Sequence, residues 1–189
     1  MASTLSVSKI QGLATAASPT TVEIASGHKL TGAAGTMAVT ESIVQTQQAI
    51  MPQTATTISS TSCVDTGLQV SLTTKLTNSK FLVMLSGGGW YDNGNSNQSM
   101  WITFQRNSAG GSYDYVTNGY QTNYGIIRMS GDGNSWNIKP YSAQIIDSPS
   151  VAAGVAMIYK VVARVNQNSC QFTSSDRGSP ILQVQEIAQ

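Results

Sequence analysis

The residues that could carry catalysis or bind a metal are few and scattered in this sequence. A single histidine, His28, has no serine, cysteine or carboxylate arranged around it in a catalytic pattern. General acid–base catalysis and metal binding at neutral pH depend mostly on histidine and on clustered carboxylates. The nine carboxylates are spread singly, and nothing in their spacing suggests a pair that flanks a glycosidic bond. We therefore expect no enzymatic activity, no cofactor and no metal site.

Two short segments share part of the pattern of ligand-binding loops. Asp92–Asn97 (DNGNSN) offers alternate oxygen atoms, but it has one carboxylate and lacks the glycine and glutamate that an EF-hand requires. The run Gly87–Gly89 is not followed by the Lys-Ser/Thr pair of a phosphate loop. For Asp92–Asn97 we favour a solvated hairpin tip, in which Asn and Gly adopt positive φ.

The two cysteines, Cys63 and Cys170, lie far apart in the sequence. One interpretation is a long-range disulfide, and the other is a pair of small buried thiols. We favour thiols, because disulfides are rare in proteins that fold in a reducing cytosol and the spacing fits no metal or redox motif.

Aromatic residues are concentrated in the middle of the chain, among Asn, Gln, Ser and Gly. Rigid tyrosine and tryptophan rings beside uncharged hydrogen-bonding side chains suit the recognition of sugars or of protein surfaces. Alternatively, these rings fill the core or a subunit contact. The candidate receptor-binding residues are Trp90, Tyr91, Trp101, Tyr113, Tyr115, Tyr120 and Trp136. Trp101 is expected to be the best exposed, because its neighbours Met100 and Ile102 form the inward face of a strand.

Charge is scarce throughout the chain. Only 10% of the 189 residues are Asp, Glu, Lys or Arg, whereas an ordinary globular domain has about 25%. The net charge is +1 and no basic run appears, which argues against a nucleic-acid partner. The apolar runs are much shorter than the roughly 20 residues of a membrane span, and no signal-peptide core is present at the start. We expect a soluble protein that is made in the cytosol and does not insert into membranes.

The first fifty residues differ in character from the rest. Residues 3–37 contain short apolar pairs between turn residues, which indicate either strands that share a core with other copies of the chain or a disordered tail. Glu41–Ile50 (ESIVQTQQAI) is expected to form a brief helix that Met51-Pro52 ends. We place a domain boundary there, with an N-terminal attachment or stalk segment over residues 1–52 and a head domain over residues 53–189.

From about Ser62 onward the sequence alternates with the period of two that is typical of strands. The expected strands are Thr66–Thr73, Lys80–Leu85, Met100–Gln105, Tyr124–Met129, Ser142–Ile146, Val155–Val165 and Ile181–Ile187. Lys80–Leu85 is apolar on both faces, as in a strand between two layers. Short strands with turns at intervals of ~8–12 residues predict an all-β fold, an antiparallel jelly roll or β-sandwich of roughly eight to ten strands.

Several short segments resemble the virion fibre proteins of tailed phages, especially those of marine cyanobacteria. The segments that resemble the heads are Ser79–Met84, Ile146–Pro149 and Ile181–Ala188, and those that resemble stalk-leading sequences are Leu5–Gly12 and Ser26–His28. The resemblance implies a homotrimer with an N-terminal stalk and a jelly-roll head of the tumour-necrosis-factor or C1q type. In such a trimer the outer face of Phe81–Leu85 would meet a neighbouring subunit.

The resulting hypothesis is a non-enzymatic fibre or spike on the assembled virion. Residues 1–50 would attach to other virion proteins, and loops 87–98, 107–123 and 131–141 would bind a host-surface glycan or protein, with avidity from several copies. The alternative is a capsid decoration or head-fibre protein that stabilises the particle rather than binding the host. A third hypothesis, a polysaccharide-degrading tailspike, requires a long β-helix and clustered carboxylates, for which this chain is too short and too poor in acids.

Overall fold

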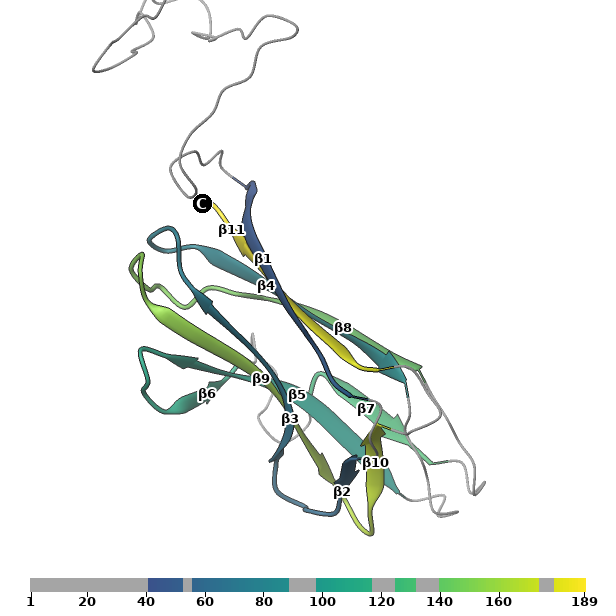
Figure 1. The fold of residues 1–189 in the computed structure, drawn as a ribbon. Helices are drawn as coiled ribbons and strands as arrows, with labels where there is room; N and C mark the ends of the chain where they lie inside the picture. The colour runs from purple at the N-terminus through teal and green to yellow at the C-terminus, as the bar shows by residue number, and fades with distance from the viewer. Residues whose placement is uncertain (1–40, 53–55, 89–97, 117–124, 132–139, 174–178) are drawn as a thin grey trace, which may run out of the picture.

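β-Strands make up the regular structure of the residues that the structure describes (Figure 1). The computed structural model describes residues 41–52, 56–88, 98–116, 125–131, 140–173 and 179–189. Within these residues the strands are β1 (Ile43–Ile50), β2 (Thr56–Ile58), β3 (Val64–Thr73), β4 (Lys80–Gly88), β5 (Ser99–Ser108), β6 (Tyr113–Tyr115), β7 (Ile127–Ser130), β8 (Pro140–Asp147), β9 (Ala156–Val165), β10 (Cys170–Thr173) and β11 (Ile181–Ile187).

The strands form two antiparallel sheets that face each other. Sheet I has the order β1-β11-β4-β8, and sheet II has the order β3-β9-β5, with β6 and β7 both paired to the far edge of β5. β2 and β10 form a small separate ladder. The chain passes from β3 in sheet II to β4 in sheet I and back to β5, and it repeats this alternation through β8, β9 and β11. This strand order is that of a jelly roll, which confirms the predicted fold class.

The prediction of a helix over Glu41–Ile50 is wrong, because Ile43–Ile50 is the edge strand β1, paired along its length with β11. A bulge between Ile43 and Gln45 shifts the register by one residue. The bulge interrupts the alternation of apolar and polar residues, and the sequence therefore resembled a helical pattern. The predicted boundary at Met51-Pro52 would group β1 with the N-terminal segment, whereas its ladder with β11 places it in the sandwich. The predicted stalk itself lies outside the described residues.

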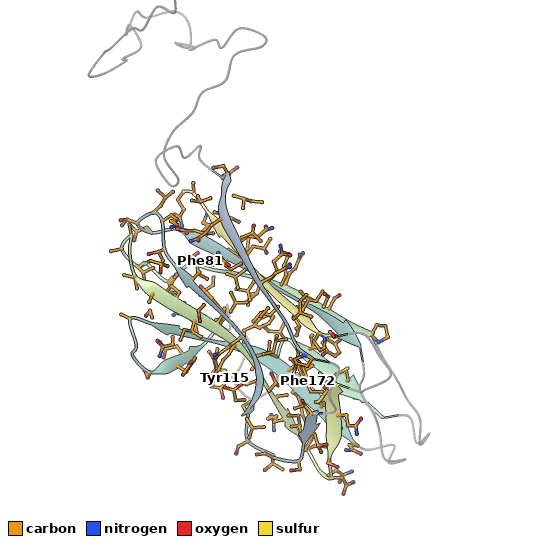
Figure 2. The ribbon with its side chains drawn as sticks, in the orientation of Figure 1. Phe81, Tyr115 and Phe172 are labelled. Atoms are coloured by element: carbon orange, nitrogen blue, oxygen red, sulfur yellow. The ribbon has the colours of Figure 1, made fainter. Side chains whose placement is uncertain are left out.

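The core is built from the inward faces of the long strands (Figure 2). On β9 the predicted apolar face is confirmed, since Met157, Tyr159 and Val161 are fully buried while Lys160 and Arg164 point the other way. Phe81 of sheet I meets Tyr159 of sheet II with 5.8 Å between ring centroids. Alternation on both sheets thus produces one apolar layer between them.

β6 and β7 continue one another along the same edge of β5. Val116 N–H donates to Phe104 O (3.0 Å) and Ile126 N–H donates to Ile102 O (2.8 Å), so β6 and β7 follow the same edge of β5 one after the other. The chain rejoins β5 at Gly125, which has φ +64°. A Cβ there would lie 2.7 Å from Ile102 O, so only glycine fits at this point.

Gly87 accommodates a buried ring. It pairs with Tyr141 of β8, and a Cβ on Gly87 would lie 2.8 Å from the tyrosine ring. Tyr141 cannot move easily, because it stacks on Phe172 (5.6 Å) and its hydroxyl donates to Phe172 O (3.1 Å). We expect Gly87→Ala to lower the free energy of unfolding by about 1–3 kcal/mol in urea titration. The control is Gly88→Ala, whose Cβ would meet only Pro140 Cα at 3.8 Å; equal losses in both variants would contradict this reason.

Candidate functional site

The two ends of the sandwich differ in what they carry (Figure 1). At one end, here called the N-terminal end, Glu41 N–H donates to Ala188 O (2.8 Å), so the chain enters the sandwich beside its own C-terminus. At the opposite end, here called the loop end, Ile50 pairs with Ile181, and Gly88 pairs with Pro140. The segments that follow β1, β4, β7 and β10 all leave from the loop end.

Two of the three predicted display loops belong to the loop end. Loop 87–98 joins β4 to β5, and loop 131–141 joins β7 to β8. Gly131 N–H, at the start of the second loop, donates to Gln98 O, at the end of the first (2.7 Å). The predicted site residues Trp90, Tyr91 and Trp136 are in these loops, outside the described residues, as is Tyr120. The candidate calcium loop Asp92–Asn97 and His28 also lie outside the described part of the chain.

The third predicted display loop, 107–123, is placed differently. β5 continues to Ser108 and a short turn leads into β6, so residues 107–115 form a hairpin and not an open loop. Ala109 N–H donates to Ala156 O (2.9 Å) at the N-terminal end. This hairpin therefore lies at the opposite end from the other two loops.

Trp101 points outward, as predicted, but the expectation that it is exposed was wrong. Its side chain is 8% exposed, because arginines on both neighbouring strands cover the ring. Arg164 of β9 lies with its guanidinium carbon 4.3 Å from the ring centroid, and Arg128 of β7 lies at 5.5 Å. The alternation of apolar and polar residues along a strand predicts which way a side chain points, but it does not predict whether side chains of neighbouring strands cover it.

Tyr113 and Tyr115 both lie on β6, on the outer face of sheet II. Tyr113 is 36% exposed and carries Lys160 Nζ at 3.8 Å from its ring centroid. Tyr115 is half-buried, and burial together with a hydrogen bond to Cys63 raises the pKa of its hydroxyl. The structure thus brings Trp101, Tyr113 and Tyr115 to one face, with Trp101 nearest the loop end.

The outer face of sheet I is almost free of charge. Cross-strand rows over this face place glutamine, threonine and serine beside isoleucine, leucine and methionine. Lys80 is its one charged side chain among the described residues. Three large apolar side chains are strongly exposed there, namely Ile43 (57%), Ile50 (57%) and Ile146 (48%). An exposed apolar face with uncharged polar groups is typical of a protein–protein contact.

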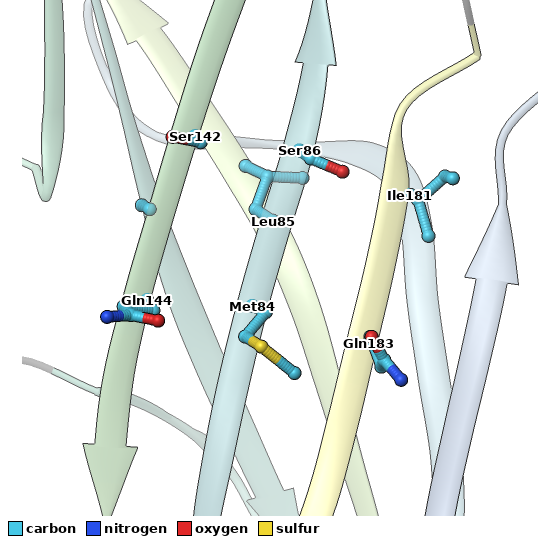
Figure 3. A pocket seen from close by; sticks show the side chains of 8 residues that line it. Met84, Leu85, Ser86, Ser142, Gln144, Ile181 and Gln183 are labelled. Atoms are coloured by element: carbon cyan, nitrogen blue, oxygen red, sulfur yellow. The ribbon is translucent and has the colours of Figure 1, made fainter.

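A shallow hollow lies in the middle of this face (Figure 3). Gln144, Met84 and Gln183 lie side by side across β8, β4 and β11, and Ser86 and Ser142 continue the hollow toward the loop end. Its lining combines amide and hydroxyl groups with apolar surface, so it can accept side chains of either kind from a neighbouring molecule.

Two carboxylates are buried in one inward row of sheet I, on either side of Phe81. Glu186 is fully buried and accepts hydrogen bonds from Lys75 N–H (2.9 Å), Leu76 N–H (3.0 Å) and Ser79 Oγ (2.7 Å), which lie in the turn between β3 and β4. Gln45 Nε2 of β1 donates to its second oxygen (2.5 Å). The carboxylate therefore holds the turn and the edge strand together, and we assign it to stability.

Asp147, the second buried carboxylate, links the two sheets. Arg106 Nη1 of β5 donates to both of its oxygens (2.6 and 2.8 Å), and Tyr159 Oη of β9 donates to one of them (2.8 Å). Burial, and then the negative charge of Asp147, raise the pKa of Tyr159 well above its ordinary value. All three groups are satisfied by one another, so this cluster also serves packing.

Cys63 and Cys170 do not form a disulfide, as favoured from the sequence; Cys170 is buried as expected, whereas Cys63 is only half-buried. In the part of the chain that the structure describes, no three His, Cys, Asp or Glu side chains gather as a metal site would need. That part also contains no helix of the length and apolarity required to cross a bilayer.

Comparison with known proteins does not identify a family or a function for this chain. No protein-family model and no curated protein matches the chain. Among solved structures, Eiger TNF from S. frugiperda is similar over 76% of this chain and 92% of that chain, with 10% identity and a TM-score of 0.39. Exo-β-1,3-galactanase from Phanerochaete chrysosporium, solved with galactose, matches over 75% of this chain and 27% of that one, with 11% identity and a TM-score of 0.21. At such scores neither likeness carries an argument about function, and the jelly-roll assignment comes from the strand order.

Proposed function

We propose that this chain is a structural virion protein, the homotrimeric head of a fibre or spike whose loop end binds a host-surface glycan or protein. The proposal rests on the observation that the chain enters the sandwich at one end and that two of the predicted binding loops leave it at the opposite end. The chain enters the sandwich at the N-terminal end, through the contact of Glu41 with Ala188. Loops 87–98 and 131–141 leave from the loop end. A head that is attached through residues 1–40 therefore points these loops away from its attachment.

The uncharged outer face of sheet I supports assembly as a homotrimer. A face whose one charged side chain among the described residues is Lys80 does not strongly repel a second copy of itself, and the exposed Ile50 and Ile146 gain from being covered. Closed rotational symmetry is the usual arrangement of identical chains and would leave the loop ends of all copies on one side. Weak contacts at each loop end would then add up through avidity.

We also propose that the role is non-enzymatic. The two buried carboxylates, Glu186 and Asp147, are both occupied in packing contacts. Aromatic rings in neutral polar loops can bind a sugar or a protein surface without chemistry.

Binding to an array of bacterial surface glycans tests the placement of the receptor site. We expect Trp90→Ala and Trp136→Ala each to weaken binding by about tenfold or more, as loss of an aromatic anchor does. The control is Tyr113→Ala, which removes an exposed ring at the N-terminal end. Equal effects of all three variants would contradict a site at the loop end. An array on which the wild-type chain binds nothing would favour the capsid-decoration role.

A further inference from the structure

A cluster of nitrogen donors lies on the outer face of sheet II, on the other sheet from the uncharged face of sheet I. Trp101 of β5 pairs directly with Arg128 of β7 on one side and with Arg164 of β9 on the other. Because all three are direct cross-strand partners, their side chains share one face. The two guanidinium carbons lie 5.5 and 4.3 Å from the indole centroid.

The positive charge of this face is concentrated at that cluster. Lys160, the third cation that the structure describes on this face, forms an ion pair with Asp65 (3.1 Å). Arg128 is exposed, and it has no ion pair among the described residues; its polar contact there is Ser99 Oγ at 3.5 Å. In a chain with 10% charged residues, two arginines beside one indole form a distinct positive site.

The indole contributes an unused donor. Trp101 is 8% exposed, and its Nε1 has no hydrogen-bond partner in the described part of the chain. A buried N–H group without an acceptor is uncommon and lowers stability, so such a group needs an explanation. A ligand oxygen would provide the acceptor.

We propose that Arg128, Arg164 and Trp101 bind an oxyanion, the carboxylate or sulfate group of an acidic polysaccharide. Guanidinium groups present paired N–H donors that match the two oxygens of such an anion, and the indole N–H supplies a further donor. Beyond the cluster the face offers exposed neutral groups, such as Gln69 and Ser71, which suit sugar hydroxyls. A nucleic acid would require cations along its whole backbone, which this face does not have. The inference does not depend on a virion role.

Binding of defined polymers tests this site. The probes are alginate, which carries carboxylates, dextran sulfate, neutral dextran and single-stranded DNA, each measured by biolayer interferometry against the full chain. We expect alginate or dextran sulfate to bind, and the polymer that binds more tightly identifies the oxyanion. Arg128→Gln is expected to weaken that binding by about tenfold, as loss of a charge-assisted hydrogen bond does.

Two further variants make the result specific. Lys80→Gln removes the same charge from the outer face of sheet I and is expected to leave binding unchanged. Trp101→Phe keeps an aromatic ring between the arginines but removes the N–H donor together with part of the indole, so it is expected to weaken binding by about threefold to tenfold. Equal losses in Arg128→Gln and Lys80→Gln would mean general charge attraction and would overturn the site. Tighter binding of single-stranded DNA than of either acidic polysaccharide, or no binding of any polyanion, would also overturn it.

Discussion

Asp147→Ala is expected to lower the free energy of unfolding by about 3–5 kcal/mol, the cost of breaking a buried ion pair by removing one partner. The side chain of Asp147 is 8% exposed and that of Arg106 is 20% exposed, so the arginine would remain partly desolvated without a counter-charge. The hydroxyl of Tyr159 would also lose its acceptor, at 2.8 Å in the wild type. Partial access of water to Arg106 places the expected loss nearer the lower figure.

Urea unfolding followed by tryptophan fluorescence at a fixed chain concentration measures this effect. The matched control is Asp65→Ala, which breaks the ion pair with Lys160 and an exposed hydrogen bond from Gly67 N–H, at an aspartate whose side chain is 48% exposed. An exposed pair contributes about 0–1 kcal/mol, so the control should lose little. Adding Arg106→Met to Asp147→Ala should recover part of the loss, because no uncompensated charge then remains. Similar losses at Asp65 and Asp147 would contradict the buried-pair explanation.

Met84→Arg is expected to convert the assembled protein into single chains. Met84 lies between Gln144 and Gln183 at the centre of the uncharged face of sheet I. A charge introduced there would be desolvated in each subunit contact and would repel its own copies. Light scattering should give about three times the chain mass for the wild type and close to 19.9 kDa, the mass of one chain, for the variant.

The control for assembly places the same charge on the other sheet. Ser71→Arg adds an arginine to the exposed outer face of sheet II and should leave the native mass unchanged. An unchanged urea midpoint for the head at low concentration would show that Met84→Arg still folds. A wild-type chain of single mass, or an assembly that survives Met84→Arg but not Ser71→Arg, would refute the placement of the contact.

The strands β3 and β11 were predictable because burial alternates regularly along them. Ile181–Ile187 was predicted with the bounds of β11, and Val155–Val165 differs from β9 by one residue. β1 was missed because its bulge breaks the alternation, and because the backbone of β11 that stabilises it is more than a hundred residues away in the sequence. Pairing over such a distance is decided by tertiary structure and not by local propensity.

The candidate sites were predictable only in part. Alternation gave the outward direction of Trp101, but its cover comes from Arg128 and Arg164, which the sequence separates from it by 27 and 63 residues. The partners of Glu186 and Asp147 could not be predicted either, because they lie on other strands and turns. The burial of the two carboxylates was signalled by the alternation, since each continues an inward row whose other members are apolar.

The pairing of β1 with β11 has a consequence for synthesis of the chain. In chain order β11 follows all the other described strands, and in sheet I it lies between β1 and β4. The ribosome exposes β1 and β4 long before β11 is made, so both strands lack their common neighbour until β11 has been translated. Sheet I, with the face that we propose for assembly, can therefore be completed only after β11 has emerged. A chain that terminates before β11 would be left with open strand edges and could not join the mature oligomer.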